Sequence, residues 1–325
     1  MKKYFSLLIA TGISLLSMAQ SDKAPYLTKS LANQTVSNVK VETSGGSISV
    51  AGVSTAEAKI EVYVTGNNNG NLSKEEIDKR LSDDYTLDVS FNNGKLTAIA
   101  KNKSYNMNWK KALNISFKVY VPKDVSTELH TSGGSINLNN LNGEQDFATS
   151  GGSLHVDGVS GKINGKTSGG SVHVSNSHDD IDLSTSGGSI EAKNCDGELR
   201  LNTSGGSIRG GNVQGELITH TSGGSITLNA LACSLETSTN GGSINVDFAS
   251  LGKYVRISNN GGDINLQLPS GKGYNLDLAG RKIDTGTLNN FSGSVENDRV
   301  SGKLNGGGTN VEVNSNSGRI SLSFN

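Results

Sequence analysis

The chain has 325 residues, enough for two ordinary domains, yet only 33% of them are apolar and 5% aromatic, whereas 42 are glycine. This is too little large apolar volume for two conventional globular cores, and the apolar residues recur too regularly for a disordered chain. The net charge of -1 provides no basic field for nucleic acid, so no nucleic-acid partner is expected.

The first 19 residues predict a cleaved secretory signal peptide. Lys2 and Lys3 form a positive head, the run 5–16 is mostly apolar, and Ser17 and Ala19 are the small residues that a cleavage site requires. A membrane anchor is the alternative, but a span needs about 20 apolar residues. We therefore expect an exported protein, located in the periplasm, on the outer surface or outside the cell, with no membrane span after cleavage.

A lead-in over 20–35 precedes a stretch, 36–53, that looks like a single copy of a repeat found later in the chain. Between 54 and 125 the repeat is lost. This part predicts four strands, over 59–64, 86–91, 95–100 and 114–121, and one short helix over about 73–81. Ser73, with Glu76 three residues later, suits a capping box at the start of that helix. We expect 54–125 to be an elaboration that covers an open end of the repeat array.

The segment 126–325 is dominated by a phrase of the type TSGGSI that returns every 18 residues. Each Thr marks position 1 of a unit: Thr131, Thr149, Thr167, Thr185, Thr203, Thr221 and Thr239, with a looser eighth unit at Asn259. Positions 6, 8, 15 and 17 are mostly apolar, with polar residues between them. Position 11 is apolar or small: Leu141, Val159, Ser177, Cys195, Val213, Leu231 and Ala249.

Apolar positions two apart indicate strands with alternate side chains inside, so each unit predicts two short strands. The glycine pair marks a corner, which we attribute to the positive φ that glycine tolerates, and Asn/Gly-rich text marks the other turn. Self-similarity at this period is typical of stacked units. The predicted fold is all-β, a single-stranded parallel β-solenoid (β-helix) of about 18-residue coils. Two outlying stretches fit the same pattern, Val39 to Val50 in 36–53 and Val311 to Leu322 near the end.

Two columns of outward residues could bind metal ions. Position 7 would align His155, His173 and Glu191 on successive coils, and these are residue types that bind zinc. Position 14 reads Glu144, Lys162, Asp180, Glu198 and Glu216, an acidic stripe that could recruit calcium. A flat column lacks converging geometry, and exposed carboxylates usually serve solubility, so we predict no metal, no cofactor and no catalytic residue. Position 1 points inward by alternation, which makes the Thr ladder a structural stack with cross-strand hydrogen bonds.

The two cysteines, Cys195 and Cys233, occupy positions 11 and 13 of units two steps apart. Two strand spacings amount to about 9.6 Å, whereas a disulfide needs Cα atoms within roughly 7 Å. We therefore expect two free thiols, although export would permit a disulfide.

With its predicted export and its TSGGSI-type coils, the chain resembles the bacterial putative-adhesin family of envelope proteins, long classed as a domain of unknown function. The shared phrase is matched by Val121, Pro122, Lys123, Leu129, Thr131, Ser132, Gly133, Gly134, Ser135 and Ile136. The resemblance covers most of 36–325 and implies a β-solenoid at the bacterial envelope, with no established catalytic residues to carry over.

Two functions are open. The first is a non-enzymatic, adhesin-like surface for binding or scaffolding, whose ligand would be a glycan or a matrix or envelope protein. The second is a polysaccharide-active enzyme on a parallel β-helix. Such enzymes have longer coils and cluster acids with Arg or Lys, whereas here the coil is short and Trp109 is the single Trp for sugar stacking. We favour binding over catalysis. A third function, an envelope-stress or assembly accessory, is not separated from the first by the sequence, which also leaves the ligand and the oligomeric state undetermined.

Overall fold

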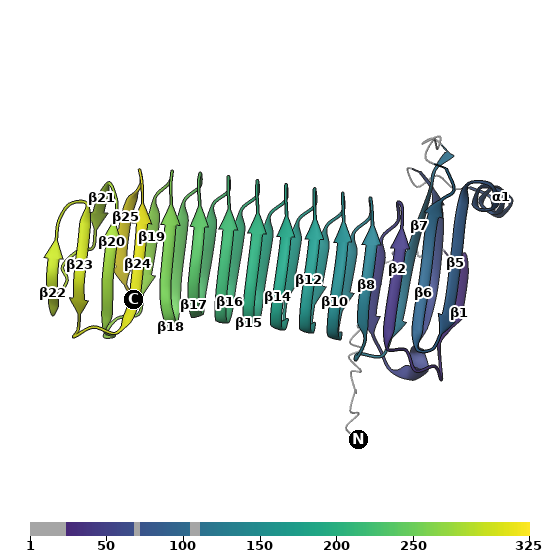
Figure 1. Ribbon diagram of the computed structural model, residues 1–325, viewed down its shortest axis with the longest axis horizontal. Coiled ribbons are helices and arrows are strands. Elements are labelled where there is room, and N and C mark those ends of the chain that lie inside the picture. Colours follow the sequence, from purple (N-terminus) through teal and green to yellow (C-terminus); the bar gives the residue numbers. More distant parts are fainter. Residues whose placement is uncertain (1–23, 68–71, 105–110) are drawn as a thin grey trace, which may run out of the picture.

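The computed structural model describes residues 24–67, 72–104 and 111–325. In these residues the chain is mostly β: 25 strands join in one large, mixed and largely parallel sheet, accompanied by one α-helix. The strands lie side by side along the long axis of the molecule (Figure 1). The predicted signal peptide over 1–19 lies outside the described residues. Within them, no helix has the length and hydropathy of a membrane span.

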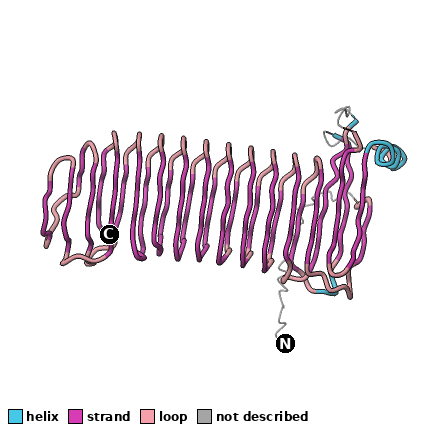
Figure 2. The backbone as a smooth tube through the Cα atoms, viewed as in Figure 1, coloured by secondary structure: helices cyan, strands magenta, loops and turns pink. Residues whose placement is uncertain are grey.

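The centre of the molecule is built from the repeated units. Its strands are β8 (Ser126–Thr131), β9 (Ile136–Asn139), β10 (Asn142–Thr149), β11 (Leu154–Asp157), β12 (Ser160–Thr167), β13 (Val172–Ser175), β14 (His178–Thr185), β15 (Ile190–Thr203), β16 (Ile208–Thr221), β17 (Ile226–Thr239), β18 (Ile244–Asn259) and β19 (Ile264–Leu268). Each unit pairs in parallel with the next at the same position, as Thr149 does with Thr167 and His155 with His173. The backbone trace shows the resulting series of matching turns (Figure 2).

The predicted alternation of inward and outward residues is confirmed. Ile190, Leu199 and Leu201, at positions 6, 15 and 17 of their unit, are fully buried. They belong to one hydrophobic cluster that includes residues from both strand segments of each unit. Neighbouring units also compensate for each other in volume. A methyl group on Gly165 would meet Phe147 of the preceding unit at 2.5 Å, so the glycine makes room for the ring.

The inward threonines of position 1 form a ladder, but they bond to the corner rather than to each other. Thr167 Oγ1 donates to the carbonyl oxygen of Gly152 in the preceding unit at 2.7 Å and accepts the N–H of Gly170 in its own unit at 3.3 Å. The same donor bond recurs in successive units up to Thr239. In the looser eighth unit Asn259 takes over, and its side-chain amide donates to the Gly242 carbonyl at 2.8 Å.

Positive φ is not the reason for the paired glycines, contrary to our interpretation of the sequence. None of the glycine pairs in these corners has a φ in the left-handed region. The second glycine is required because the backbones of successive corners nearly touch: a Cβ on Gly170 would lie 2.0 Å from the carbonyl oxygen of Gly152. The first glycine has room, since a Cβ on Gly169 would be 3.5 Å from its nearest neighbour.

The left-handed conformation occurs at the opposite turn, at position 10. The residues there with positive φ are Asn140, Gly158, Asn176, Asn194, Asn212 and Ala230. Asparagine tolerates this conformation better than most residues, which explains the Asn/Gly-rich text of that turn. From Ile190 onward the pairing continues through the turn, so that β15, β16 and β17 each run for 14 residues.

The last regular unit departs from its predecessors at position 11. Ala249 is exposed, and Phe248 is fully buried opposite Leu231 instead. The pairing of β17 with β18 shifts register on both sides of this point. The unit from Thr239 to Asn259 is longer than its predecessors, and the irregularity absorbs the extra residues while a large apolar side chain fills the interior.

The N-terminal end contains the predicted elements. They are β1 (Leu27–Ser30), β2 (Asn38–Thr43), β3 (Ile48–Gly52), a 3-10 turn (Thr55–Glu57), β4 (Lys59–Gly66), α1 (Lys74–Asp84), β5 (Tyr85–Asn92), β6 (Lys95–Asn102) and β7 (Leu113–Val121). The four strands and the helix predicted in 54–125 are thereby confirmed, whereas β1 in the lead-in was not foreseen. Ser73 caps α1 by accepting the N–H of Glu76, but the Glu76 carboxylate binds Arg80 at 2.7 Å instead of completing a capping box.

The order of strands at this end differs from their order in the chain. The strand pair β2–β3 stacks on β8–β9, with Thr43 beside Thr131 and Ile48 beside Ile136. On its other side β2 pairs with β6 and β3 pairs with β7. The segment 38–52, read as an isolated repeat, therefore lies between the elaboration and the main array.

At the C-terminal end, too, the order of strands in the sheet differs from their order in the chain. This end consists of β20 (Tyr274–Ala279), β21 (Lys282–Asp284), β22 (Phe291–Val295), β23 (Arg299–Leu304), β24 (Thr309–Ser315) and β25 (Arg319–Phe324). The last two strands pair with β18 and β19 on one side and with β20 and β21 on the other. The predicted repeat near the end of the chain is confirmed, but β22 and β23 form an antiparallel hairpin at the tip. The uniform array expected over 126–325 is therefore interrupted between β19 and β24, where β23 pairs antiparallel with both β20 and β22.

Both cysteines are buried and free, as predicted. Cys195 pairs with Val213 and Cys233 with Gly215, so they lie two strands apart at different positions in their units. Burial raises the pKa of both thiols, that of Cys233 to about 12. Each acts as a small apolar side chain of the interior.

Candidate functional site

The predicted column of His155, His173 and Glu191 is present. Strand pairing places the three residues side by side on the outside of β11, β13 and β15. The two imidazole rings stack face to face with centroids 5.1 Å apart, and His173 Nδ1 lies 3.3 Å from the Glu191 carboxylate. Stacked rings direct their nitrogens along parallel planes rather than towards a common point. In the described part of the chain, no three His, Cys, Asp or Glu side chains group as a metal site would require.

Acidification is expected to destabilise this histidine stack. Burial, and then the charge of His173, lower the pKa of His155 below its ordinary value of 6.5. The folded protein therefore binds fewer protons here than the unfolded chain. The stability linked to His155 is fully present above about pH 6.5 and falls as the pH drops below that value.

The measurement is the melting temperature of wild type and His155→Asn at pH 8 and pH 5. Asparagine is the matched replacement, because Asn137 occupies the same register in the preceding unit. We expect the variant to gain about 1–2 °C over wild type on going from pH 8 to pH 5, a small effect because the ring is largely in water. If the melting temperatures of the two proteins differed by the same amount at both pH values, the pKa of His155 would not be lowered in the folded protein.

The acidic stripe at position 14 is also assembled, but most of its charges have partners. Asp180, Glu198 and Glu216 are aligned by strand pairing. Glu198 forms an ion pair with Arg200, and Glu216 accepts a hydrogen bond of 2.8 Å from the hydroxyl of Tyr254. Such a stripe of paired and exposed carboxylates has the character of a solvated strand face.

A groove lies elsewhere, along the glycine corner of the array. It has a volume of 1080 Å³ and crosses seven neighbouring units, from β2 to β16. Most of its lining comes from the residue just before and the residue just after each inward threonine, at positions 18 and 2, and residues 101–104 complete it at the N-terminal end. Because the threonine points inward, its two neighbours must point outward, and identical units place them in two parallel rows.

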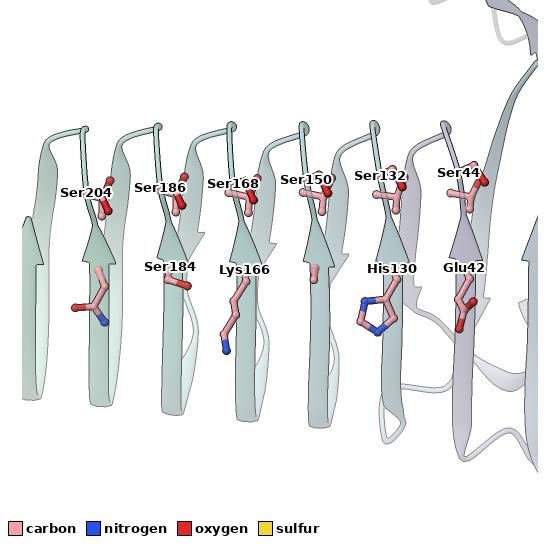
Figure 3. A pocket seen from close by; sticks show the side chains of 18 of the residues that line it. Glu42, Ser44, His130, Ser132, Ser150, Lys166, Ser168, Ser184, Ser186 and Ser204 are labelled. Carbon is pink, nitrogen blue, oxygen red and sulfur yellow. The ribbon is translucent and has the colours of Figure 1, made fainter. Parts of the chain in front are cut away.

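Position 2 gives a row of identical hydroxyl groups (Figure 3). Its members are Ser44, Ser132, Ser150, Ser168, Ser186, Ser204 and Ser222. With strands about 4.8 Å apart, the seven hydroxyls extend over roughly 30 Å. Among the described residues, no protein group is hydrogen-bonded to any of these hydroxyls. Beyond Ser222 asparagines continue the row, and they bond to one another, Asn260 to Asn240 and Asn316 to Asn260, at 2.7 Å.

Position 18 gives a varied second row. It contains Glu42, His130, Ala148, Lys166, Ser184, Asn202 and His220. Lys166 lies in the middle of the groove with its side chain extended along the wall (Figure 3), and no described residue forms an ion pair with it. The groove therefore offers hydrogen-bond donors and acceptors along its whole length, with the ammonium group of Lys166 near its centre and those of Lys101 and Lys103 at its N-terminal end.

The N-terminal end of the groove is bounded by a network of charges. Glu42 contacts Lys101, which lowers the pKa of the Glu42 carboxyl, and lies 3.1 Å from Lys40. Lys40 in turn bonds Glu128 at 2.6 Å, which raises the pKa of the Lys40 amine. These four charges neutralise each other, and Lys103, which also lines this end of the groove, donates to the backbone carbonyl of Ser82.

Sequence reasoning missed the groove. Position 2 is serine in every unit from Thr131 to Thr221, and this regularity was a visible signal. The serine belongs to the corner phrase, which indicated a turn, whereas the residues that suggested a site lie at positions 7 and 14. Trp109, considered for sugar stacking, lies outside the described residues.

Comparison with known proteins gives one family. A family model described as "Toastrack DUF4097" matches residues 61–323, about four-fifths of the chain. Among solved structures, a putative cell adhesion protein from Clostridium sporogenes ATCC 15579 matches with 12% identity over 92% of this chain and 98% of that one. The TM-score of that match is 0.20, too low to support any argument. Curated proteins gave no match.

Proposed function

The chain belongs to the toastrack DUF4097 family, and from this premise we propose that it is an exported, non-enzymatic protein of the bacterial cell envelope. Its stacked units would form a β-solenoid that serves as an adhesin-like binding or scaffolding surface. The observation that carries the proposal is the serine-lined groove, which crosses seven units without interruption.

The chemistry of the groove supports an extended ligand that lies along the stack. Seven unpartnered hydroxyls at the strand spacing form a periodic polar surface, suited to a polymer with many hydroxyl, amide or carbonyl groups. Lys166 adds an anchor for a single negative charge. A glycan or an extended segment of a matrix or envelope protein has this character.

The same lining supports binding rather than catalysis. Glycoside hydrolysis generally needs two carboxyl groups about 5–9.5 Å apart. Among the described residues that line the groove, Glu42 is the one carboxylate, and it contacts both Lys101 and Lys40. An acid held between two cations is kept ionised and is poorly placed to donate a proton.

The test is binding of the purified protein to glycan and matrix-protein arrays, followed by a groove variant. Ser168→Tyr places a bulky ring in the middle of the groove at an exposed outward position, so it should leave the fold intact. We expect its affinity for the array ligand to fall at least about tenfold, from loss of contacts worth about 1.4 kcal/mol or more.

The matched control is Thr227→Tyr. It introduces the same ring at position 7, an outward position that does not line the groove. It should bind like wild type. Equal binding by Ser168→Tyr and wild type would show that the groove is not the binding surface. If neither array yields a ligand, the binding function itself is contradicted.

A further inference from the structure

The C-terminal tip of the molecule ends in a strand that lacks the usual protection of a sheet edge. Strand β22 pairs with β23 and, among the described residues, has no strand on its other side (Figure 1). Its sequence, Phe291-Ser292-Gly293-Ser294-Val295, carries no charge and no proline. The other end strands do carry charges, such as Lys29 in β1 and Lys282 in β21. Uncharged open edges are prone to pair with another strand.

The inward face of β22 is also uncovered at its C-terminal end, whereas Phe291 at the other end packs against the core. Val295 pairs directly with Val300, and Phe291 with Leu304, so all four side chains lie on the same face. Val300 and Leu304 are buried at 1% and 5% exposure, whereas Val295 is 58% exposed. An apolar side chain that points to the interior side of the sheet thus lies beyond the end of the core.

Alternate residues of β22 direct their backbone N–H and C=O groups away from β23, where a further antiparallel strand could bind them. Asn290 and Glu296 bond to β23 through their backbones, as acceptor from Asn305 and donor to Arg299. In an antiparallel strand, alternate residues direct their groups to the same neighbour. The backbone groups of Phe291, Gly293 and Val295 therefore point to the open edge.

We propose that β22 is a homodimerisation strand that pairs antiparallel with β22 of a second copy about a two-fold axis at Gly293. The strand is close to a palindrome, which is what a two-fold interface needs, because the same patch must complement itself. Phe291 would face Val295 of the partner, a favourable aromatic and β-branched pair, on both sides of the axis. The outward-pointing backbone groups of one copy then meet those of the other.

The neighbouring residues and the size of the surface set the expected strength. In this register Glu296 faces an asparagine, Asn290, so no like charges are opposed. One five-residue edge buries much less than the roughly 800 Å² per partner of a standard interface. The dimer is therefore weak and depends on concentration, and it would join two arrays end to end at the tips remote from their N-terminal caps.

Sedimentation equilibrium of the purified protein, up to about 500 μM, tests the association, since small interfaces bind weakly. We expect a monomer–dimer equilibrium whose dissociation constant rises at least tenfold in Val295→Lys, because the charge would face Phe291 of the partner. The control is Leu27→Lys, at another exposed large apolar side chain, on β1 at the opposite end. It should dimerise like wild type. A protein that is monomeric throughout, or a dimer that Val295→Lys leaves unchanged, would overturn the proposal.

Cysteine cross-linking tests the register even if Val295→Lys alters the tip. Ser292 of one copy would face Ser294 of the other, with Cα atoms about 4.5 Å apart in a non-hydrogen-bonded pair, within disulfide range. A mixture of Ser292→Cys and Ser294→Cys should therefore form a disulfide-linked dimer on mild oxidation, whereas each variant alone should not. The native thiols are buried and should not interfere. Equal cross-linking by a single variant, or none in the mixture, would contradict pairing about Gly293.

Discussion

Replacing Ile226 by Asp is expected to lower the free energy of unfolding by about 4 kcal/mol or more, the scale of an unpaired charge in an apolar interior. Ile226 is fully buried at position 6 of its unit, and its neighbours in the column, Ile208 and Ile244, are equally buried. They offer no group that could pair with a carboxylate.

The measurement is thermal and denaturant unfolding followed by circular dichroism. Units of a repeat array contact mainly their neighbours, so the loss should centre on the adjoining units, which hydrogen exchange can locate. The control is Thr227→Asp, one residue along the same strand but on the outside and beside Arg209. It should keep the stability of wild type. Equal loss in both variants would refute the inside and outside assignment.

Replacing Gly170 by Ala is expected to cost about 3 kcal/mol, the upper range for forcing an extra methyl group into a packed site. The new Cβ would lie 2.0 Å from the carbonyl oxygen of Gly152, and that oxygen also accepts the hydrogen bond of Thr167 Oγ1. Relieving the clash must separate the two corners and so lengthen this bond.

The control is Gly169→Ala, one residue earlier in the same corner. A Cβ there has its nearest neighbour at 3.5 Å, an ordinary contact, so the melting temperature should change little. If both alanines were equally harmful, backbone conformation rather than close approach would explain the glycine pair. If neither alanine lowered the stability, successive corners would not be packed as closely as the structure shows.

Much of the local structure could be predicted because it depends on periods within the sequence. Alternate residues of a strand face opposite sides, so the buried positions 6, 8, 15 and 17 could be identified without coordinates. The helix after Ser73 and the four strands around it were predicted for similar local reasons. The separation of Cys195 from Cys233 followed from the same period.

The candidate site was less accessible to prediction, although its residues are regular. The outward direction of the serine row follows from alternation, but the groove along it exists only in the stacked array. The glycine pair was misinterpreted for a related reason. A need for positive φ is a property of one residue, whereas the actual contact, between Gly170 and Gly152, exists only when two units are stacked.

The sequence alone determined the repeat, its 18-residue period and the inward side of each strand, because these properties are set by residues close together in the chain. Only the tertiary structure decided the order of strands at the two ends. There β2–β3 lies between β6–β7 and β8–β9, and β24–β25 lies between β18–β19 and β20–β21. Similar units present similar edges, so the local pattern of a strand fits several neighbours equally well. The choice among them depends on which arrangement buries the most apolar surface for the whole chain.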